Sequence, residues 1–503
     1  MKLELIAMTK RFSPYALFLV LLFLIGDCTF LQNASVEISA EQQQGQPRPW
    51  FRAVTPLRQL YVSPTGTSDG GSAGSPMSLK KAIDTAKAGD LFWLQEGQYK
   101  GAFILQKNSG TEKNPIIFRG APGKRVVVQG SFQVFTAYTW IWGLEIMDPG
   151  GVSETSGVDM LAPGIHVINN VIHDQKGKVG IGSWQTGEDQ VIYGNIVYKQ
   201  IPKQNNPHNL YIQNDFAHMG YKYIVNNMFL DSRDATEATY NVHAYTQNSL
   251  ITGLWFEQNI VRNGIFLIGG FNLPADHEVV KQNYFYKSPV QIGYRRPTQV
   301  RFQYNYLGRS ELITQYFWGF GETQFKQTAP NIYSNNEILL PPAPHIDFST
   351  SAFIGPDNRC DGCAKIRPVD IFDQNKYTSP FHARFYADNQ NLGVLGMDGW
   401  QSATAAAGKR FDANSAIVGA PRETKVVILK NDFEPTRANL VVYNWSNAAK
   451  VRADLGSFLH AGSRFTIYDA KKVFQTPTLS GTYSGPIELP MGKEFGAFVI
   501  IQQ

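Results

Sequence analysis

The sequence predicts an all-β fold: a right-handed parallel β-helix solenoid with an N-terminal capping helix, followed by a small C-terminal antiparallel β-sandwich. Three observations predict it. A degenerate strand repeat fills the middle of the chain, one amphipathic helix precedes the repeat, and short alternating strands return near the C-terminus. We expect a β-helix over 59–340, an irregular connection over 341–420 and a sandwich over 421–503.

The repeat consists of seven β-rich runs, each ending in asparagine followed by further strand residues. The anchors are Asn170, Asn195, Asn227, Asn259, Asn283, Asn305 and Asn336, separated by 25, 32, 32, 24, 22 and 31 residues. A unit of this size cannot bury its own apolar face, so the units must stack. Asparagine tolerates the left-handed turn conformation, and stacked asparagines can form a hydrogen-bond ladder along the stack.

The N-terminal region has the composition of an export signal. Three basic residues frame the start of an apolar stretch over 12–25, too short to span a bilayer comfortably, which predicts a cleaved signal peptide over 1–28. An uncleaved anchor is the alternative. Asp27 before Cys28 departs from the small residue of a lipoprotein site. A Gln- and Pro-rich linker over 29–58 follows. We therefore expect a secreted, periplasmic or cell-surface protein without a transmembrane segment after cleavage.

The capping helix is predicted from Ser78 and the residues after it. Ser78 is a suitable N-cap, and apolar residues at 79, 82, 83 and 86 form one helical face. A helix over the first coil would cover an otherwise open β edge. At the other end, runs such as 426–429, 440–443 and 495–500, separated by turn residues, predict the sandwich.

Composition limits the function without deciding it. A formal charge of +5 over 503 residues permits an anionic substrate but does not require one, and no basic run indicates nucleic acid. Cys360 and Cys363 are too few for a four-cysteine zinc site. A local disulfide and two free thiols remain open for this pair.

Side chains alternate along a strand, so the strand after each asparagine turn divides into inner and outer positions. The apolar or small pairs are expected to face the core: Ile181/Ser183, Leu210/Ile212, Val242/Ala244, Ile265/Leu267 and Val290/Ile292. The outward columns are then Gly182, Tyr211, His243, Phe266, Gln291 and Trp184, Gln213, Tyr245, Ile268, Gly293. Aromatic rings with polar tips suit sugar rings, so we expect a binding groove; a face covered by a long loop is the alternative.

Two histidines lie within one coil of each other on this face. His208 and His243 are candidates for a general acid/base pair or for part of a metal site. Tyr211 and Tyr245 are the neighbouring groups able to transfer a second proton.

Charged residues in the connections add further candidates. Arg233 and the pair Arg295–Arg296 could neutralise a carboxylate or sulfate, or could be plain surface charge. Four carboxylates could form a hydrolase pair, hold calcium or solvate the loops: Asp215, Asp231, Asp234 and Glu237.

The opening of the solenoid resembles a known group of proteins. Tyr61-Val62-Ser63-Pro64-Thr65-Gly66, the helix over 79–86 and the run from Gly89-Asp90 to Gly97-Gln98-Tyr99 resemble secreted right-handed parallel β-helix (pectin-lyase-like) proteins. That group includes polysaccharide lyases of the chondroitinase B and alginate lyase kind. The resemblance covers about residues 60–340 and implies a carbohydrate-active protein. Pectate lyases of this fold use calcium, which makes calcium a candidate cofactor.

We therefore expect a polysaccharide lyase that acts by β-elimination on a uronic-acid-containing polysaccharide. The expected catalytic residues are His208, Tyr211, His243, Tyr245 and Arg295; the expected substrate contacts are Trp184, Gln213, Phe266 and Arg233. The alternatives are a β-helix glycoside hydrolase using two carboxylates and a non-catalytic glycan-binding surface protein. The expected partner is a polysaccharide, and the expected state is a monomer.

Overall fold

The structure is a computed structural model of the 503-residue chain. It describes residues 48–177, 179–201, 208–215, 220–232, 239–270, 273–293, 297–314, 329–342, 344–348, 370–387, 390–406 and 408–503. The chain divides into two units, Met1–Pro49 and Trp50–Gln503, and the β-helix and the C-terminal sandwich both belong to the second. The predicted signal peptide, Cys28, Cys360 and Cys363 lie outside the described residues. Within the described part of the chain, no helix has the length and apolar character needed to cross a membrane.

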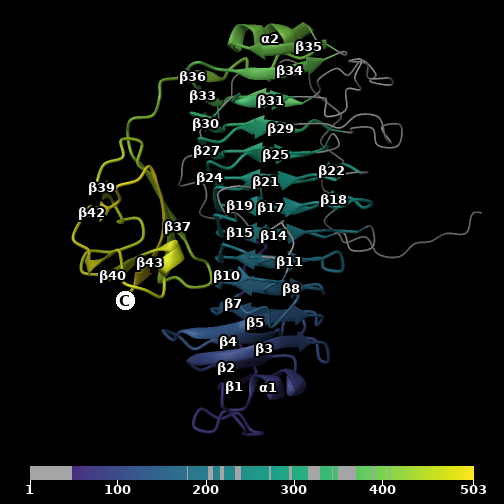
Figure 1. Ribbon diagram of the computed structural model, residues 1–503, viewed down its shortest axis with the longest axis vertical. Helices are drawn as coiled ribbons and strands as arrows, with labels where there is room; N and C mark the ends of the chain where they lie inside the picture. Colours follow the sequence, from purple (N-terminus) through teal and green to yellow (C-terminus); the bar gives the residue numbers. More distant parts are fainter. Residues whose placement is uncertain are drawn as a thin grey trace, which may run out of the picture. The chain divides into compact units, whose positions relative to one another are not determined.

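Most of this unit is a parallel β-helix whose coils carry strands on three faces (Figure 1). The first face contains β1 (Arg58–Val62), β2 (Asp90–Leu94), β4 (Ile116–Gly120), β6 (Thr139–Trp142), β9 (His166–Ile168), β12 (Gln190–Tyr193), β15 (Lys222–Val225), β19 (Leu254–Glu257), β23 (Val279–Lys281), β26 (Arg301–Gln303), β29 (Ile332–Ser334) and β32 (Ile371–Asp373).

The second face contains β7 (Glu145–Asp148), β10 (Val171–Gln175), β13 (Ile196–Tyr198), β16 (Met228–Leu230), β20 (Ile260–Arg262), β24 (Tyr284–Tyr286), β27 (Tyr306–Gly308), β30 (Glu337–Leu339), β33 (Lys376–Thr378) and β36 (Ala416–Val418). The third contains β8 (Val158–Met160), β11 (Ile181–Ser183), β14 (His208–Ile212), β17 (Tyr240–Ala244), β21 (Ile265–Ile268), β25 (Val290–Ile292), β28 (Leu312–Ile313), β31 (Ile346–Phe348) and β34 (Ala383–Ala387). The long strands β3 (Gly97–Leu105) and β5 (Val126–Val134) come before these two faces separate, and β5 pairs with both β7 and β8. A short parallel pair, β18 (Ile251–Thr252) and β22 (Ala275–Asp276), lies between coils.

The predicted cap is confirmed. Helix α1 (Leu79–Thr85) begins after Ser78, whose hydroxyl accepts a hydrogen bond from the backbone N–H of Lys81 at 3.2 Å. Leu79, Ala82 and Ile83 are its buried residues and belong to the same apolar core as the solenoid strands. The helix therefore closes the first coil with its apolar face.

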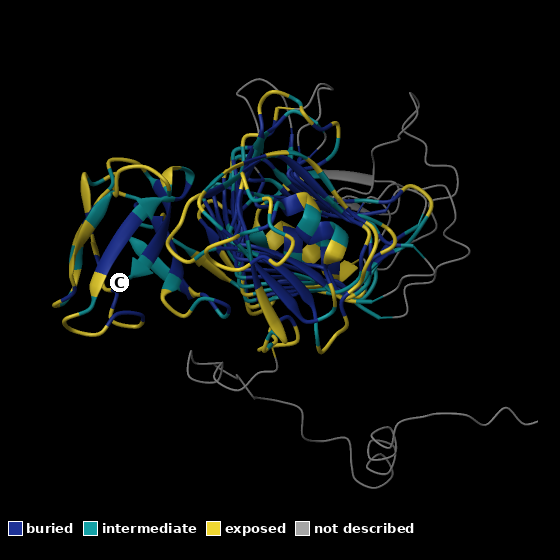
Figure 2. Ribbon diagram, turned by 90° about the horizontal axis from the view of Figure 1, so that it is seen from below, coloured by how far each residue is buried: buried dark blue, intermediate teal, exposed yellow. Residues whose placement is uncertain are grey.

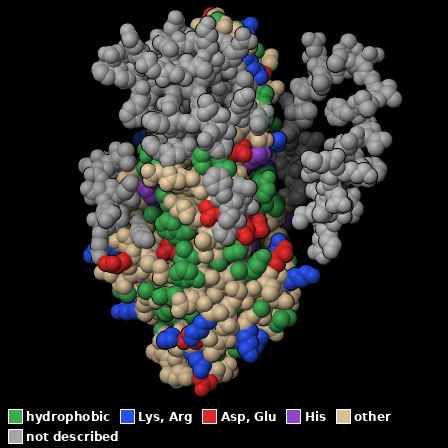
Figure 3. Space-filling view, turned by 90° about the vertical axis from the view of Figure 1, so that its right-hand side faces the viewer, with side chains coloured by type: hydrophobic (Ala, Val, Ile, Leu, Met, Phe, Trp, Pro, Cys, Tyr) green, Lys and Arg blue, Asp and Glu red, His purple; other side chains and the backbone are tan. Residues whose placement is uncertain are grey.

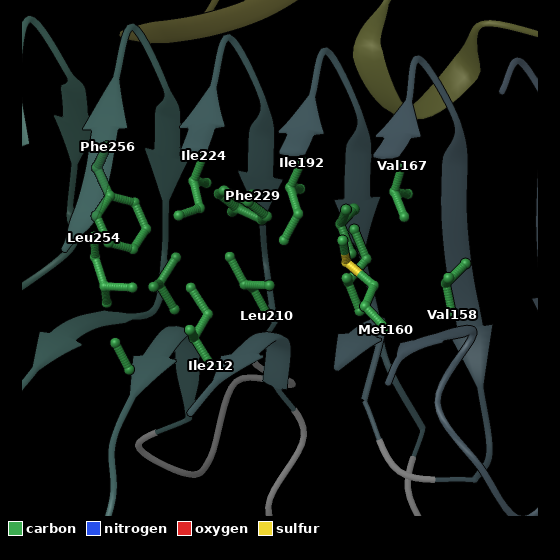
Figure 4. Close-up of a cluster of buried hydrophobic side chains, with 14 of the residues drawn as sticks. Val158, Met160, Val167, Ile192, Leu210, Ile212, Ile224, Phe229, Leu254 and Phe256 are labelled. Carbon is green, nitrogen blue, oxygen red and sulfur yellow. The ribbon is translucent and has the colours of Figure 1, made fainter. Parts of the chain in front are cut away.

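The interior is a continuous apolar column. Val167, Ile192, Ile224 and Phe256 occupy equivalent positions on consecutive first-face strands, and all are at most 2% exposed (Figure 4). Viewed from below, the buried residues lie within the coils, while exposed residues concentrate in the connections (Figure 2). Stacking of like apolar positions is what a single coil cannot supply for itself.

The predicted asparagine ladder is confirmed. Between the first and second faces, Asn195 Oδ1 accepts hydrogen bonds from the backbone N–H of Asn170 at 2.9 Å and from its Nδ2 at 3.1 Å, while Asn195 Nδ2 donates to Val167 O at 2.8 Å. The same amide contacts recur along the stack. The ladder members are Asn170, Asn195, Asn227, Asn259, Asn283, Asn305, Asn336 and Asn375.

The left-handed residue of each turn is not the ladder asparagine, which corrects our expectation. It is the residue before it, as at Asn169 (φ 52°), Asn226 (φ 57°), Gln258 (φ 57°) and Tyr304 (φ 58°). The ladder side chain is thereby free to point inward and pair with its neighbours.

The solenoid also extends beyond the predicted boundary at residue 340. Strands β31, β32, β33, β34 and β36 continue the three faces, so the segment 341–420 is not simply an irregular connection. The ladder ends at Asp412, whose carboxylate accepts from Asn375 Nδ2, the Tyr377 hydroxyl and Trp400 Nε1. The antiparallel strand β35 (Gln390–Leu395) and helix α2 (Met397–Ala406) follow β34.

The C-terminal antiparallel β-sandwich is confirmed. One sheet has the order β37 (Lys425–Lys430), β38 (Arg437–Tyr443), β43 (Phe495–Gln502), β40 (Arg464–Asp469) and β41 (Leu479–Thr482), and the other pairs β39 (Lys450–Ala453) with β42 (Ile487–Pro490). They share a core, and a short 3-10 helix (Ala470–Lys472) follows β40. Tyr443 donates its hydroxyl proton to Phe285 O at 2.9 Å, and Asn439 Nδ2 donates to Asn226 O at 2.7 Å, which attach the sandwich to the solenoid.

The predicted linker over 29–58 is too long at its C-terminal end. Trp50 is 7% exposed, its ring lies 6.2 Å from that of Tyr223, and its Nε1 donates to Asp432 at 3.0 Å. From Trp50 onward the chain is part of the packed unit.

A ladder substitution tests this construction. Asn259→Ala removes the acceptor of the Asn227 amides and the donor to Ile224 O, all in buried surroundings. We expect a loss of about 3 kcal/mol in unfolding free energy, measured by urea denaturation, because buried polar groups lose their partners. Asn108→Ala, at an exposed position, is the matched control and should stay within about 0.5 kcal/mol. If both variants lose the same unfolding free energy, the ladder hydrogen bonds do not stabilise the fold more than a surface asparagine does.

A buried histidine provides a pH test. His166 is 8% exposed and stacks on Trp140 at 4.4 Å, and burial, with a smaller contribution from Arg52, lowers its pKa from 6.5 to about 3. The unfolded chain therefore binds this proton first, so its contribution to stability is present above pH 6.5 and is lost as the pH falls toward 3. His166→Phe keeps an aromatic ring and should flatten the fall in melting temperature over that range. Parallel curves for the two proteins would contradict the assignment.

Candidate active site on the third face

Five rings from β14, β17 and the residue after β17 form one cluster outside the core: His208, Tyr211, Tyr240, His243 and Tyr245. Leu210, Ile212, Val242 and Ala244 are fully buried, so alternation turns Tyr211 and His243 outward, and the two are paired in register. The inner apolar pattern therefore accounts for Tyr211, His243 and Tyr245, whereas His208 and Tyr240 join the cluster from the first residues of β14 and β17.

The rings are in mutual contact. His243 stacks on Tyr240 at 4.2 Å and on Tyr245 at 5.2 Å, and it meets Tyr211 edge-on at 5.3 Å. His208 stacks on Tyr211 at 5.7 Å.

In the space-filling view, hydrophobic side chains gather between acidic and histidine side chains on one side of the molecule, so its surface is mixed rather than uniformly charged (Figure 3).

The two histidines are directly bonded. His243 Nδ1 lies 3.1 Å from His208 Nε2, so one proton stands between the two rings. Burial, followed by the proximity of His208, lowers the pKa of His243 from 6.5 to about 3. His243 is consequently neutral near pH 7 and keeps a lone pair. Its Nε2 is buried and has no hydrogen-bond partner among the described residues. A pair of this kind can accept one proton and share it.

Tyr211 is held from two sides. Gln213 Nε2 donates to the Tyr211 hydroxyl at 2.8 Å, and the Trp184 ring lies 5.5 Å from the Tyr211 ring. The indole of Trp184 is itself fixed, because its Nε1 donates to Asp159 Oδ1 at 2.6 Å. Burial raises the pKa of Tyr211, against the smaller opposite effect of Gln213, so the phenol keeps its proton at neutral pH.

Phe266 is not a substrate contact, which corrects the sequence prediction. It is 1% exposed and packs edge-on against Phe256 at 5.0 Å and Phe285 at 5.2 Å inside the core. The register between β17 and β21 shifts between Tyr240 and Val242, so His243 pairs with Leu267. This irregularity moves the inner positions from Ile265 and Leu267 to Phe266 and Ile268, because one residue of slip exchanges the two faces.

The charged candidates are only partly described. Arg233, Asp234, Glu237, Arg295 and Arg296 lie outside the described residues. Asp215 is described and partly buried, on the segment that follows β14.

Asp231 is committed to structure. It forms ion pairs with Arg262 and, at 2.7 Å, with Lys471 of the C-terminal domain. Both cations hold the pKa of this carboxyl at about 2, against the effect of burial. Asp231 is thus a link between solenoid and sandwich rather than a member of a catalytic pair.

Sequence reasoning missed three residues of this region. The predicted strand began at Asn241, whereas β17 begins one residue earlier, at Tyr240, so Tyr240 was not considered as a site residue. Asp159 comes from the coil before Trp184, and nothing in its local sequence indicates that contact. Lys222 stands five residues before the ladder asparagine Asn227. An alignment of the repeats on their asparagines would have shown a charged residue there, where the next coil has Leu254.

Comparison with known proteins supports the resemblance of the opening coils to polysaccharide lyases. Residues 74–141 match the model of the family Chondroitinase B. The pectate disaccharide-lyase of Dickeya chrysanthemi is 33% identical over 92 residues, which are 18% of this chain and 12% of that enzyme. The match therefore spans a small part of the relative's length. The family match ends before β8 and does not include the ring cluster.

Two solved structures share low sequence identity with this chain. Pectate lyase Pel9A has 14% identity and a TM-score of 0.37, over 61% of this chain and 83% of that chain. XylC, solved with xylose, has 11% identity and a TM-score of 0.40, over 88% of this chain and 100% of that chain. The fold assignment itself rests on the strand pairing described above.

Two adjacent residues test the inner and outer assignment. Val242→Asp places a carboxylate in the core and should unfold the solenoid locally, whereas His243→Ala should cost only about 1 kcal/mol, since its ring lies outside the core. Thermal melting of both variants measures the difference. If His243→Ala melts as early as Val242→Asp, the ring cluster is part of the core and the candidate site is wrong.

Proposed function

We propose that this protein is a polysaccharide lyase that cleaves a uronic-acid-containing polysaccharide by β-elimination at the ring cluster of the third face. The observation that carries the proposal is the 3.1 Å contact between His208 and His243, beside tyrosines that keep their protons. The similarity of residues 74–141 to the Chondroitinase B family supports the reaction class. The proposal includes a secreted, periplasmic or cell-surface location, where such polysaccharides occur, and a monomeric protein.

The mechanism needs a base for the C5 proton, an acid for the departing C4 oxygen and relief of the uronate charge. In our proposal neutral His243 or His208 takes the C5 proton, and their contact lets the second ring share the charge. Tyr211 or Tyr245 donates to the C4 oxygen, because burial raises both pKa values and keeps both phenols protonated. Arg233 and Arg295 remain proposed partners of the carboxylate. Trp184 and Gln213 remain proposed contacts for the sugar.

Calcium enters no step of this proposal. The described residues contain no group of three or more His, Cys, Asp or Glu side chains able to hold a metal ion. The chemistry assigned above uses imidazole and phenol groups, which transfer protons without a cation.

The hydrolase alternative needs two carboxylates beside the scissile bond. Among the described acidic residues, Asp159 accepts from Trp184 and Asp231 is neutralised by two cations, which leaves Asp215, on the segment after β14, as a single described carboxylate for this alternative. Those commitments favour the lyase. A non-catalytic glycan-binding role uses the same rings and is separated from the lyase by the assay below.

The assay is incubation with pectate, alginate, chondroitin sulfate and hyaluronan, read as ultraviolet absorbance of the unsaturated product. We expect one of these to be cleaved, and His243→Ala to lower turnover by about 100-fold or more, the effect of removing a general base. Gln291→Ala, which is partly exposed and lies two strands further along the same column, is the control and should retain most activity.

The other outcomes decide between the alternatives. New reducing ends without unsaturated product, from any glycan, would replace the lyase with a hydrolase. Glycan binding without turnover that survives the double substitution of His208 and His243 would select the binding protein.

A further inference from the structure

A lysine lies inside the solenoid directly behind the ring cluster. Lys222, at the start of β15, is 1% exposed, on the same inner side as the core residue Ile224. Its Nζ donates to the Ser183 hydroxyl at 3.0 Å, to Trp184 O at 2.8 Å and to Gln213 O at 2.7 Å. An ammonium group has three N–H donors, and each has one acceptor here.

The hydroxyl partner cannot reverse its role without breaking another bond. Ser183 Oγ donates its own proton to Gln190 Oε1 at 2.6 Å, and Gln190 Nε2 donates to Met160 O and Ala162 O. Ser183 therefore only accepts from Lys222. The complete network requires the protonated lysine.

The two carbonyl partners belong to the residues that hold Tyr211. Trp184 lies against the Tyr211 ring, and Gln213 donates to the Tyr211 hydroxyl. Trp184 follows β11 and Gln213 follows β14, so their backbones come from adjacent coils. One buried cation thus sets the separation of two residues that flank the proposed proton donor.

We propose that Lys222 is a positioning residue: its ammonium group fixes the backbones of Trp184 and Gln213 and so fixes Tyr211, and loss of its proton loosens the site. This inference rests on the proposed function for its effect on turnover, but its structural part does not. A buried cation stays in place only while acceptors satisfy its N–H groups. A small displacement of a reacting group lowers the reaction rate strongly.

The proton of Lys222 can be lost under ordinary conditions. Burial lowers its pKa from 10.5 to about 7, opposed by the charges of Glu188 and Asp215. His243, with a pKa near 3, is neutral throughout that range. Near pH 7 a neutral amine would keep two donors for three acceptors, so one of the bonds to Ser183, Trp184 or Gln213 would be lost.

The test follows the Trp184 indole N–H signal by NMR of protein labelled with ¹⁵N-tryptophan, assigned with Trp184→Phe. In the wild type the signal should move as the pH passes about 7, and in Lys222→Met it should be displaced and independent of pH over that range. Leu254→Met is the matched control, because Leu254 is the register partner of Lys222 on the next coil and lies in the apolar core. Its Trp184 signal should match the wild type.

Two further readouts keep the test decisive. Ser183→Ala removes one acceptor but keeps the charge, and should displace the signal in the same direction by less. On a cleaved polysaccharide, Lys222→Met should lower kcat by about 100-fold with little change in KM, as displacement of a reacting group does.

The proposal and the proposed function fail separately. A Trp184 signal that does not move near pH 7 in the wild type, or that moves equally in Lys222→Met, would overturn the role of Lys222. A signal that behaves as expected in a protein that cleaves none of the polysaccharides would support Lys222 and overturn the lyase.

Discussion

The asparagine ladder is the interaction on which the rest of the structure depends. The amide of Asn195, like those along the ladder, bonds the coil before it and the coil after it, and its partners are buried, so water cannot replace these bonds. The ladder fixes where each coil turns from the first face to the second. Every strand after the turn inherits that register, and the third face, where the ring cluster lies, inherits it last.

The ring cluster shows how packing in the core positions titratable side chains on the outer face. Val242 and Ala244 are held in the core, so His243 must face outward, where Tyr240 and Tyr245 stack on its ring. The stacking removes water, and the missing water, more than any charge, lowers the pKa of His243. Under the proposed function, this tyrosine–histidine cluster on a parallel sheet would be a preorganised group of proton carriers.

The sequence allowed most of the fold to be predicted, because the ladder asparagines and the alternating core residues are local signals. The sequence was insufficient where the strand register shifts although the residues on both faces stay apolar. The irregularity between Tyr240 and Val242 exchanges the faces of the next strand, and Phe266 and Leu267 are both apolar enough for either side. Likewise, the last coils were missed because the spacings to Asn375 and Asp412 lengthen to 39 and 37 residues.

One interior position explains why the site could be predicted only in part. On four successive coils the residue five places before the ladder asparagine lies at the start of a first-face strand, or directly before it, and is buried: it is Gln190, Lys222, Leu254 and Glu278. The carboxyl group of Glu278 accepts a hydrogen bond from the Leu254 N–H, and burial raises its pKa well above its usual value. Lys222 instead bonds the carbonyls behind Trp184 and Gln213. The outward residues Trp184 and Gln213 are thus one half of the candidate site. The other half is the inner residue Lys222, which holds their backbone carbonyls. Alternation reveals the first half, whereas the second requires the stacking of one coil on the next.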